Sequence, residues 1–264
     1  MSAPDSVAIA PYLSQIALPQ GSVLHESGAL IDTVYFPLSG AVSLLAVMNG
    51  GEATELACVG REGAVGLSAH SGLWRANSYA LVQAPGLAAA ISSSVLWAMI
   101  SQSETMRDLV FRYESIVSAQ GHQLAACNAL HSVEERVARW LLQFSDRVGD
   151  AELPTTHDLI AQSVGVQRTT ITLIAQKLQR NGLIHYHRGH MTICGRDGLK
   201  ALACECYDAW RRAEALFEWG DLPAAQIGTR IGFGATALAR NTEPRRLSIN
   251  RGSRIARASE RRRG

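Results

Sequence analysis

The segment Thr155–Cys194 constrains the fold most strongly, because its pattern predicts two short helices followed by a hairpin. Thr155 and Asp158 have the spacing of a capping box, which marks the start of the first helix. Gly165 tolerates a positive φ angle, so the chain can reverse direction sharply there. A second helix is expected over residues 167–180, where apolar residues recur at helical spacing: Ile171, Ile174, Ala175 and Leu178. The pattern is that of a helix-turn-helix.

A β-hairpin is expected after the helix stop at Asn181-Gly182. Its tip is Arg188-Gly189, and its apolar positions are Ile184, Tyr186, Met191 and Ile193. A hairpin in this position is the wing of a winged helix-turn-helix. The alternative interpretation is a helical hairpin whose polar face is simply solvated.

The outer face of the second helix is polar and almost free of acidic residues. Its members are Arg168, Thr169, Thr172, Leu173, Gln176 and Arg180. A surface that lies among phosphates must have this character. Arginine can form two hydrogen bonds with guanine, glutamine can pair with adenine, and a threonine methyl group can contact thymine. The sequence therefore predicts that this helix reads double-stranded DNA.

Residues 21–91 have a different pattern, with short apolar segments broken by glycine. The expected strands are Ser22–His25, Val34–Phe36, Ala41–Met48, Glu52–Val59, Ser78–Ala84 and Leu87–Ile91. Asn49-Gly50-Gly51 is a strong hairpin signal between two of them. Short strands with closely spaced turns indicate a small antiparallel barrel or jelly roll. The fold class is thus α+β, with an N-terminal antiparallel β-roll.

A short helix over Val95–Ser101 and then a long helix, capped by Ser103, are expected to follow the roll. Apolar residues alternate spacings of four and three along the long helix, with one polar exception: Met106, Val110, Tyr113, Val117, Gln120 and Leu124, continuing to Cys127. A heptad seam of this kind predicts a dimer interface. The alternative is a long amphipathic helix that lies on its own roll. We favour the dimer helix, because DNA readers of this type need two copies.

A further capping box, Ser132 with Glu135, opens a helix over Val133–Val148, and Asp197–Trp210 is expected to close the DNA-binding domain as one helix. The predicted domains are a sensor roll over residues 1–101, a dimerisation helix over 102–130, a winged helix-turn-helix over 131–210 and a tail over 211–264. The tail is rich in arginine and is expected to be disordered.

Composition narrows the class of protein. A hydrophobic content of 47% and a charged content of 18% are those of a soluble globular protein. No apolar run approaches the roughly eighteen residues that span a bilayer, and no signal peptide is apparent. The 5 cysteines are scattered without a paired spacing, which favours a reducing cytoplasm.

Enzymatic and metal chemistry have little support in the sequence. No Ser/His/Asp, paired-carboxylate or phosphate-loop arrangement stands out, so the chain is not expected to be an enzyme. Potential metal ligands crowd into the wing, which leaves a metal enzyme or sensor as an alternative: His185, His187, His190 and Cys194. Because these do not fit a common zinc spacing, no metal site is predicted.

The order of roll, long helix and winged helix-turn-helix resembles the Crp/Fnr family of bacterial transcription regulators. The resemblance covers about Pro19 to Ala209, and its clearest segments are Val34–Gly40, Val59–Gly66 and the helix-turn-helix. It implies a homodimer on a palindromic operator, a roll that senses a small-molecule effector, and RNA polymerase as a further partner. The DNA-contacting positions that follow are Thr155, Thr156, Gln167, Arg168, Thr169, Thr170, Thr172, Leu173, Gln176 and Arg188.

The roll departs from the cyclic-nucleotide-binding members of this family. Leu67 follows Gly66 where those members carry a glutamate that holds the ribose. Arg75 could still stand where their arginine pairs with the cyclic phosphate. A pocket formed by Gly66, Leu67 and Arg75 is therefore incomplete, and the roll is expected to bind another ligand or none. A cyclic-nucleotide-responsive regulator and a roll used only as a dimer platform are the alternatives.

No cofactor is expected. Iron–sulfur members use an N-terminal cysteine cluster, whereas no cysteine precedes Cys58. Haem-sensing members use an axial histidine, but His25 and His70 are isolated in the sequence.

The recognition helix departs from the best-known members as well. Arg168 matches their first arginine, but Thr169 and Leu173 replace an acid and a second arginine. The preferred operator should therefore differ from the family's usual one, with Leu173 placed to contact a thymine methyl group.

Overall fold

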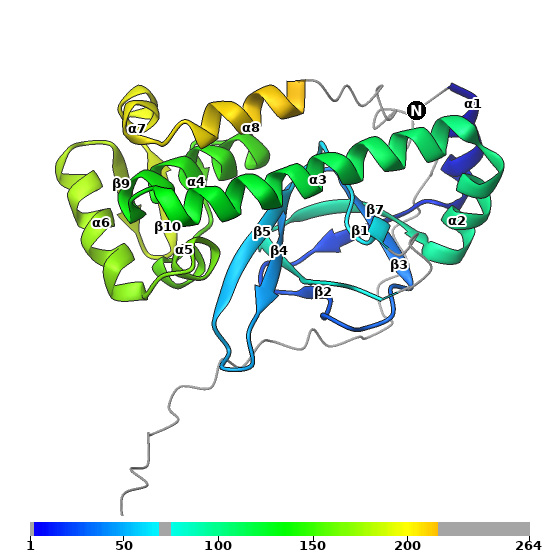
Figure 1. The fold of residues 1–264 in the computed structure, drawn as a ribbon, viewed down its shortest axis with the longest axis horizontal. Coiled ribbons are helices and arrows are strands. Elements are labelled where there is room, and N and C mark those ends of the chain that lie inside the picture. Colours follow the sequence, from blue (N-terminus) through cyan, green and yellow to red (C-terminus); the bar gives the residue numbers. More distant parts are fainter. Residues whose placement is uncertain (1–2, 69–74, 216–264) are drawn as a thin grey trace, which may run out of the picture.

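The computed structural model describes residues 3–68 and 75–215. Figure 1 shows three parts: an N-terminal β-roll, a long helix (α3) and a C-terminal domain. Helix α3 runs along one side of the roll, and the C-terminal domain lies at the C-terminal end of α3. The described part of the tail is helical up to Ala215, and the predicted disorder of residues 216–264 lies outside the described residues.

The roll consists of two antiparallel sheets, in the strand orders β1-β7-β3 and β2-β6-β4-β5. Helix α1 (Ala3–Ile9) and a 3₁₀ turn, η1 (Ala10–Tyr12), precede them. The strands are β1 (Ser14–Leu18), β2 (Val23–His25), β3 (Thr33–Pro37), β4 (Ala41–Val47), β5 (Ala53–Val59), β6 (Tyr79–Ala84) and β7 (Gly86–Ser92). Every strand predicted from the sequence is present, and β1 is an addition. Alternate side chains such as Val42, Val59 and Val82 fill the space between the sheets.

Helices α2 (Ser93–Gln102) and α3 (Glu104–Leu130) follow the roll. The Ser103 hydroxyl caps α3 by accepting a hydrogen bond from the Met106 amide, at 3.2 Å. Met106, Val110 and Tyr113 are buried in one core with the roll, and the Tyr113 hydroxyl donates to the Ala64 carbonyl oxygen at 2.9 Å. This face of α3 therefore belongs to the interior of the chain.

The first half of the α3 heptad seam is not available to a partner helix, which corrects that part of the predicted dimer interface. Met106, Val110 and Tyr113 are buried against the roll, and Val117 packs on the same core. Gln120 and Leu124 line a cavity between α3, β5, α4 and α8. The spacing of three and four that pairs two helices is also the spacing that lays one helix along a core, so the sequence pattern cannot separate the two.

Helix α4 (Val133–Val148) has the predicted bounds and the predicted capping box between Ser132 and Glu135. Trp140, Leu141 and Phe144 form its buried side and anchor the core of the C-terminal domain. The other elements of that core are α5 (His157–Val164), α6 (Arg168–Arg180) and a small antiparallel sheet of β8 (Glu152–Leu153), β9 (Ile184–His187) and β10 (His190–Ile193).

The closing helix is broken into α7 (Arg196–Leu202) and α8 (Cys206–Ala215), which corrects the single helix expected over Asp197–Trp210. Ala203 has an extended backbone, with ψ at 147°, and this residue ends α7. The chain then turns so that α8 packs against α3 (Figure 1). As a result, Cys204 and Cys206 are buried beside Cys127 at the end of α3.

The C-terminal domain rests directly on the roll. Gln83 in β6 donates to the Ser163 hydroxyl in α5 at 3.0 Å, and Gln20 donates to the Pro154 carbonyl oxygen at 2.6 Å. The Trp140 indole donates to the buried Glu55 carboxylate at 3.4 Å. Roll residues such as Ala41 and Cys58 belong to the same apolar core as α4. Within residues 3–68 and 75–215, no helix is both long and apolar enough to cross a membrane.

Candidate nucleic-acid interface

The predicted helix-turn-helix is formed by α5 and α6. Gly165 occupies the turn with φ at 72°, in the left-handed region that glycine tolerates. The buried residues that hold the two helices together are Ile160, Ala161, Val164, Ile171, Ala175 and Leu178. Because both helices are anchored by full burial of these side chains, the outer face of α6 has a fixed orientation.

The start of α5 differs from the prediction by one residue. Thr156 is the cap, and its hydroxyl accepts a hydrogen bond from the Leu159 amide at 3.2 Å. Thr155 is completely buried, and its backbone amide donates to the Leu153 carbonyl oxygen at 2.8 Å. The expected DNA contact of Thr155 is therefore wrong, because its side chain is enclosed by protein. Thr156 stays at the surface.

The outer face of α6 is open to solvent and carries no acidic residue of its own. Arg168, Thr169, Leu173 and Gln176 are exposed on it, and Gln167 is exposed at its N-cap. Leu173 is 66% exposed, although a large apolar side chain on a polar face gains nothing from water.

Two of the expected contact residues have structural partners on this face. The Arg168 guanidinium lies 3.4 Å from the Asp158 carboxylate, and both side chains are largely exposed. The Thr172 hydroxyl donates to the Arg168 carbonyl oxygen and lies 3.1 Å from His157 Nδ1. Thr172 thus fixes α6 against α5, and Thr170 is half-buried beside it.

The wing is joined to both helices. The Tyr186 amide donates to the Gln179 side chain at 3.0 Å, and the Tyr186 ring stacks on His157 with 4.4 Å between ring centroids. Burial lowers the pKa of His157, with a smaller contribution from the nearby Arg168 charge, so this imidazole stays neutral at pH 7. The wing therefore moves with the helices as one body.

The wing tip has the predicted geometry. Strands β9 and β10 pair with His187 opposite His190, and Arg188 and Gly189 form the turn with φ at 46° and 86°. Two successive positive φ angles are those of a type I′ hairpin turn. Arg188 is exposed at the tip of the wing.

The histidines of the wing do not assemble with Cys194. His190 Nδ1 lies 3.2 Å from the Glu152 carboxylate. Among the described residues, no histidine of the wing belongs to a group of three or more potential metal ligands. A different group is assembled from Cys127, His131, Cys204 and Cys206. This group was not predicted from the sequence, although the Cys-x-x-x-His and Cys-x-Cys spacings are a signal for it.

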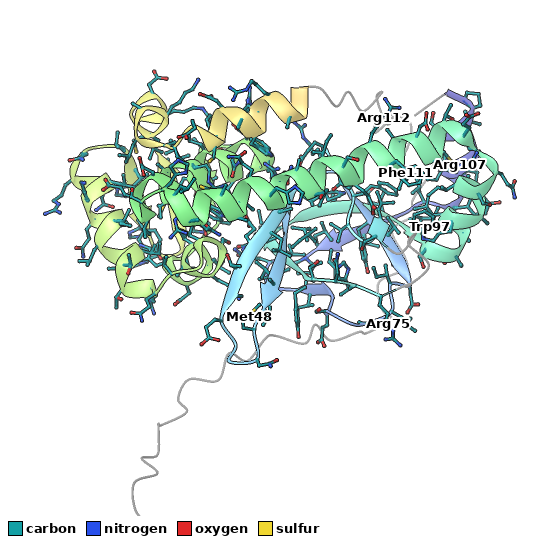
Figure 2. All side chains as sticks on the ribbon, in the orientation of Figure 1. Met48, Arg75, Trp97, Arg107, Phe111 and Arg112 are labelled. Carbon is teal, nitrogen blue, oxygen red and sulfur yellow. The ribbon has the colours of Figure 1, made fainter. Side chains whose placement is uncertain are left out.

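The roll encloses a cavity of about 330 Å³ next to α3. Gly66 and Leu67 line it, as expected, together with His25 and Tyr113. Arg75 does not line it, because its guanidinium donates to the Gly28 carbonyl oxygen at 2.7 Å, and Figure 2 shows the side chain at the edge of the roll away from α3. Of the three candidate ligand-binding residues, Arg75 is therefore outside the cavity.

The cavity has no positive charge at neutral pH among its described lining residues. Burial lowers the pKa of His25 to about 4, so this imidazole is uncharged at pH 7. The acidic Glu114 is also part of the lining. A cavity with these groups has no charge-assisted donor for a phosphate.

Comparisons with known proteins agree with this architecture. Residues 135–202 match the family model of the Crp-like helix-turn-helix domain. The chain is similar in structure to a c-di-GMP-responsive global regulator from Xanthomonas campestris, with 20% identity, a TM-score of 0.61, and coverage of 74% of this chain and 100% of that chain. It is also similar to a Crp/Fnr family regulator from Thermus thermophilus, with 25% identity, a TM-score of 0.56, and coverage of 72% of this chain and 98% of that chain. No curated protein matches the sequence.

Residues 135–202 are therefore identified as a Crp-like helix-turn-helix domain. The chain as a whole has a fold similar to that of a Crp/Fnr family regulator.

Proposed function

We propose that the chain acts as a homodimer that binds a palindromic operator, with the two α6 helices in successive major grooves. The observation that carries this proposal is the outer face of α6, which is exposed, free of acidic residues and centred on the solvent-facing Leu173. Acid-free polar faces on a rigid helix-turn-helix suit the phosphate-lined major groove.

The side chains of this face divide into two roles. Arg168, Thr169, Leu173 and Gln176 point away from the protein and would contact base edges, as bidentate donors or as apolar contacts with thymine. Around them, groups at the helix start and at the wing tip would contact phosphates: Thr156, Gln167, Thr170 and Arg188. The base contacts would set the operator sequence, and the phosphate contacts would set the register.

The dimer would form through the side of α3 that faces away from the roll. Its exposed members recur at spacings of three, four and seven, and most are small: Phe111, Ser115, His122, Ala126 and Ala129. Small residues let two helices approach closely, and Phe111, at 59% exposed, offers an apolar anchor. Pairing along this side would place the two half-sites about 34 Å apart, which is one turn of DNA.

The roll would sense an effector that is not a cyclic nucleotide. Leu67 and the uncharged His25 line the cavity, and Arg75 is committed to Gly28 on the outside. We expect cyclic AMP and cyclic GMP to leave DNA affinity unchanged. A cyclic-nucleotide-responsive regulator, the alternative, would bind one of them in a calorimetric titration. The protein would work in the cytoplasm, where a reducing environment keeps its cysteines from forming disulfides.

The test is a selection of bound genomic fragments, performed with and without small molecules extracted from cells. The selected fragments should share an inverted repeat, and purified protein should bind it as a dimer in sedimentation analysis. A monomeric protein that prefers no duplex over random competitor DNA would overturn the proposal.

A further inference from the structure

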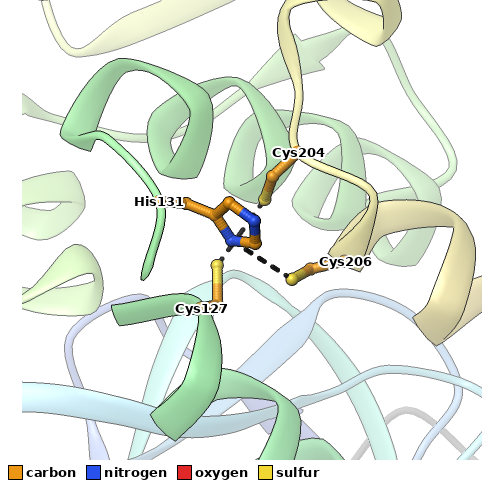
Figure 3. A group of neighbouring side chains, drawn as sticks. All are labelled: Cys127, His131, Cys204 and Cys206. Carbon is orange, nitrogen blue, oxygen red and sulfur yellow. Dashed lines mark hydrogen bonds between the residues drawn. The ribbon is translucent and has the colours of Figure 1, made fainter. Parts of the chain in front are cut away.

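Four potential metal ligands meet where α3 joins the C-terminal domain (Figure 3). We call this group the thiol–histidine cluster, and its members are Cys127, His131, Cys204 and Cys206. Cys127 lies in the last turn of α3, and His131 is the C-cap residue of the same helix. The other two flank the start of α8. The cluster thus joins segments that are 77 residues apart in the sequence.

The separations in the cluster are those of ligands around one tetrahedral ion. All four ligand atoms lie within 4.8 Å of one another. The sulfurs of Cys127 and Cys204 are 3.6 Å apart, and the Cys206 sulfur is 3.5 Å from His131 Nδ1. Tetrahedral zinc, with Zn–S of about 2.3 Å and Zn–N of about 2.0 Å, requires about 3.8 Å between two sulfurs and about 3.5 Å between sulfur and nitrogen.

Neighbouring groups complete the site in the way that metal sites require. His131 directs Nδ1 into the cluster, and its Nε2 lies 3.1 Å from the Glu205 carboxylate. A carboxylate on the second nitrogen orients a ligating imidazole and raises its basicity. The Gln123 side chain donates to the Cys206 sulfur at 3.0 Å, as it would to a thiolate. These partners are typical of the outer shell of a metal site.

The cluster is enclosed but reachable. Cys127, Cys204 and Cys206 are at most 5% exposed. The cavity beside them, of about 110 Å³, is also lined by Cys127 and Cys206 and offers a route for an ion.

We propose that the thiol–histidine cluster is a structural zinc site that fixes the junction between α3 and the DNA-binding domain. Three thiolates and one imidazole are a closed donor set for this ion, with no open position for a substrate. An iron–sulfur cluster distributes its ligands over two or more irons, so ligand atoms on different irons would lie farther apart than the 4.8 Å that contains all four here. Binding deprotonates the cysteine ligands and releases their protons to solvent.

Zinc at this position would cross-link three segments, which are the end of α3, the α3–α4 connection and the start of α8. The angle at which α4 leaves α3 would then be set by metal coordination as well as by packing. If the chain dimerises through α3, as proposed above, the ion also sets the separation of the two α6 helices.

The first experiment measures metal in protein purified under reducing conditions after growth with zinc. Wild type should contain about one zinc per chain. Cys204→Ser should lose it, whereas Cys194→Ser, which changes an exposed cysteine outside the cluster, should retain it. Cobalt(II) added to the metal-free wild type should give the visible bands of a tetrahedral ion and thiolate charge-transfer bands. Because this measurement uses wild-type protein, it does not depend on whether the Cys204→Ser variant folds.

The second experiment tests the outer shell. Glu205 is 79% exposed, so Glu205→Gln should leave the fold intact and weaken zinc affinity about 10–100-fold in competition with a chromophoric chelator. An unchanged affinity would refute the role of Glu205. Substoichiometric metal in wild type, an octahedral cobalt spectrum, or a Cys127–Cys204 disulfide in protein purified without oxygen would overturn the zinc site.

Metal analysis does not depend on DNA, so the two proposals fail separately. If chelation releases zinc but leaves operator affinity unchanged, the site exists and its control of the junction is refuted. If no operator is found while zinc is bound stoichiometrically, the zinc site stands and the proposed function falls.

Discussion

Replacing Arg168 with alanine tests the DNA-reading face with a magnitude that the structure sets. In the free protein the Arg168 guanidinium touches Asp158 at 3.4 Å, with the two side chains 60% and 63% exposed. Exposed pairs of this kind contribute less than about 1 kcal/mol, so Arg168→Ala should barely change the free energy of unfolding. Any loss of DNA affinity then reports on the interface alone.

The expected loss follows from the contact that Arg168 is placed to make. A bidentate hydrogen bond to guanine contributes about 1–3 kcal/mol of discrimination, which corresponds to about 5–150-fold in affinity. A dimer carries two copies, so independent half-sites would lose about 2–6 kcal/mol in total. Asp158→Asn removes the carboxylate that competes for Arg168 and should strengthen binding.

The assay is fluorescence anisotropy with the selected operator and with duplexes changed at one base pair per half-site. Arg168→Ala should bind the operator weakly and should no longer distinguish it from one of the changed duplexes. Arg61→Ala, which removes an exposed arginine on the roll, is the matched control and should bind as wild type. A uniform loss on every duplex would make Arg168 a phosphate contact, and no loss at all would remove it from the interface.

Two further predictions concern the dimer and the roll. Ala126→Glu places a charge on the exposed side of α3 and should dissociate the dimer in sedimentation analysis. Met48→Glu changes a residue on the roll well away from α3 (Figure 2) and should leave the dimer intact. A dimeric Ala126→Glu protein would argue against this side of α3 as the interface. Burial holds the pKa of His25 at about 4, below its ordinary 6.5, so the unfolded chain takes up a proton that the folded chain does not. The contribution of His25 to the free energy of unfolding should therefore be constant above pH 6.5 and fall by about 3 kcal/mol toward pH 4. Urea unfolding of His25→Gln should lack this contribution to the acid-induced loss of stability.

Local signals predicted most of the fold. The strands of the roll follow apolar segments bounded by glycine, α4 begins at a complete capping box, and the turn at Gly165 needs its positive φ. Each of these depends on residues that are close in the sequence, so the pattern contains all the information required.

Non-local features could not be predicted in this way. The α3 seam has a spacing that serves a partner helix and a core equally well, and only the three-dimensional position of the roll decides between them. Thr155 and Thr156 are chemically alike neighbours, and burial alone makes the second one the cap. The thiol–histidine cluster depends on the break at Ala203, which the helical pattern over residues 197–210 concealed.

The contact between Gly165 and the roll has a mechanical consequence. A side-chain carbon at residue 165 would come within 3.1 Å of the Thr54 hydroxyl in β5, so the pivot between α5 and α6 sits directly on that strand. The Gln83–Ser163 hydrogen bond connects the end of α5, next to this turn, to β6. A change in the position of either strand would therefore be transmitted directly to the turn that orients α6, through Thr54 and through the Gln83–Ser163 hydrogen bond.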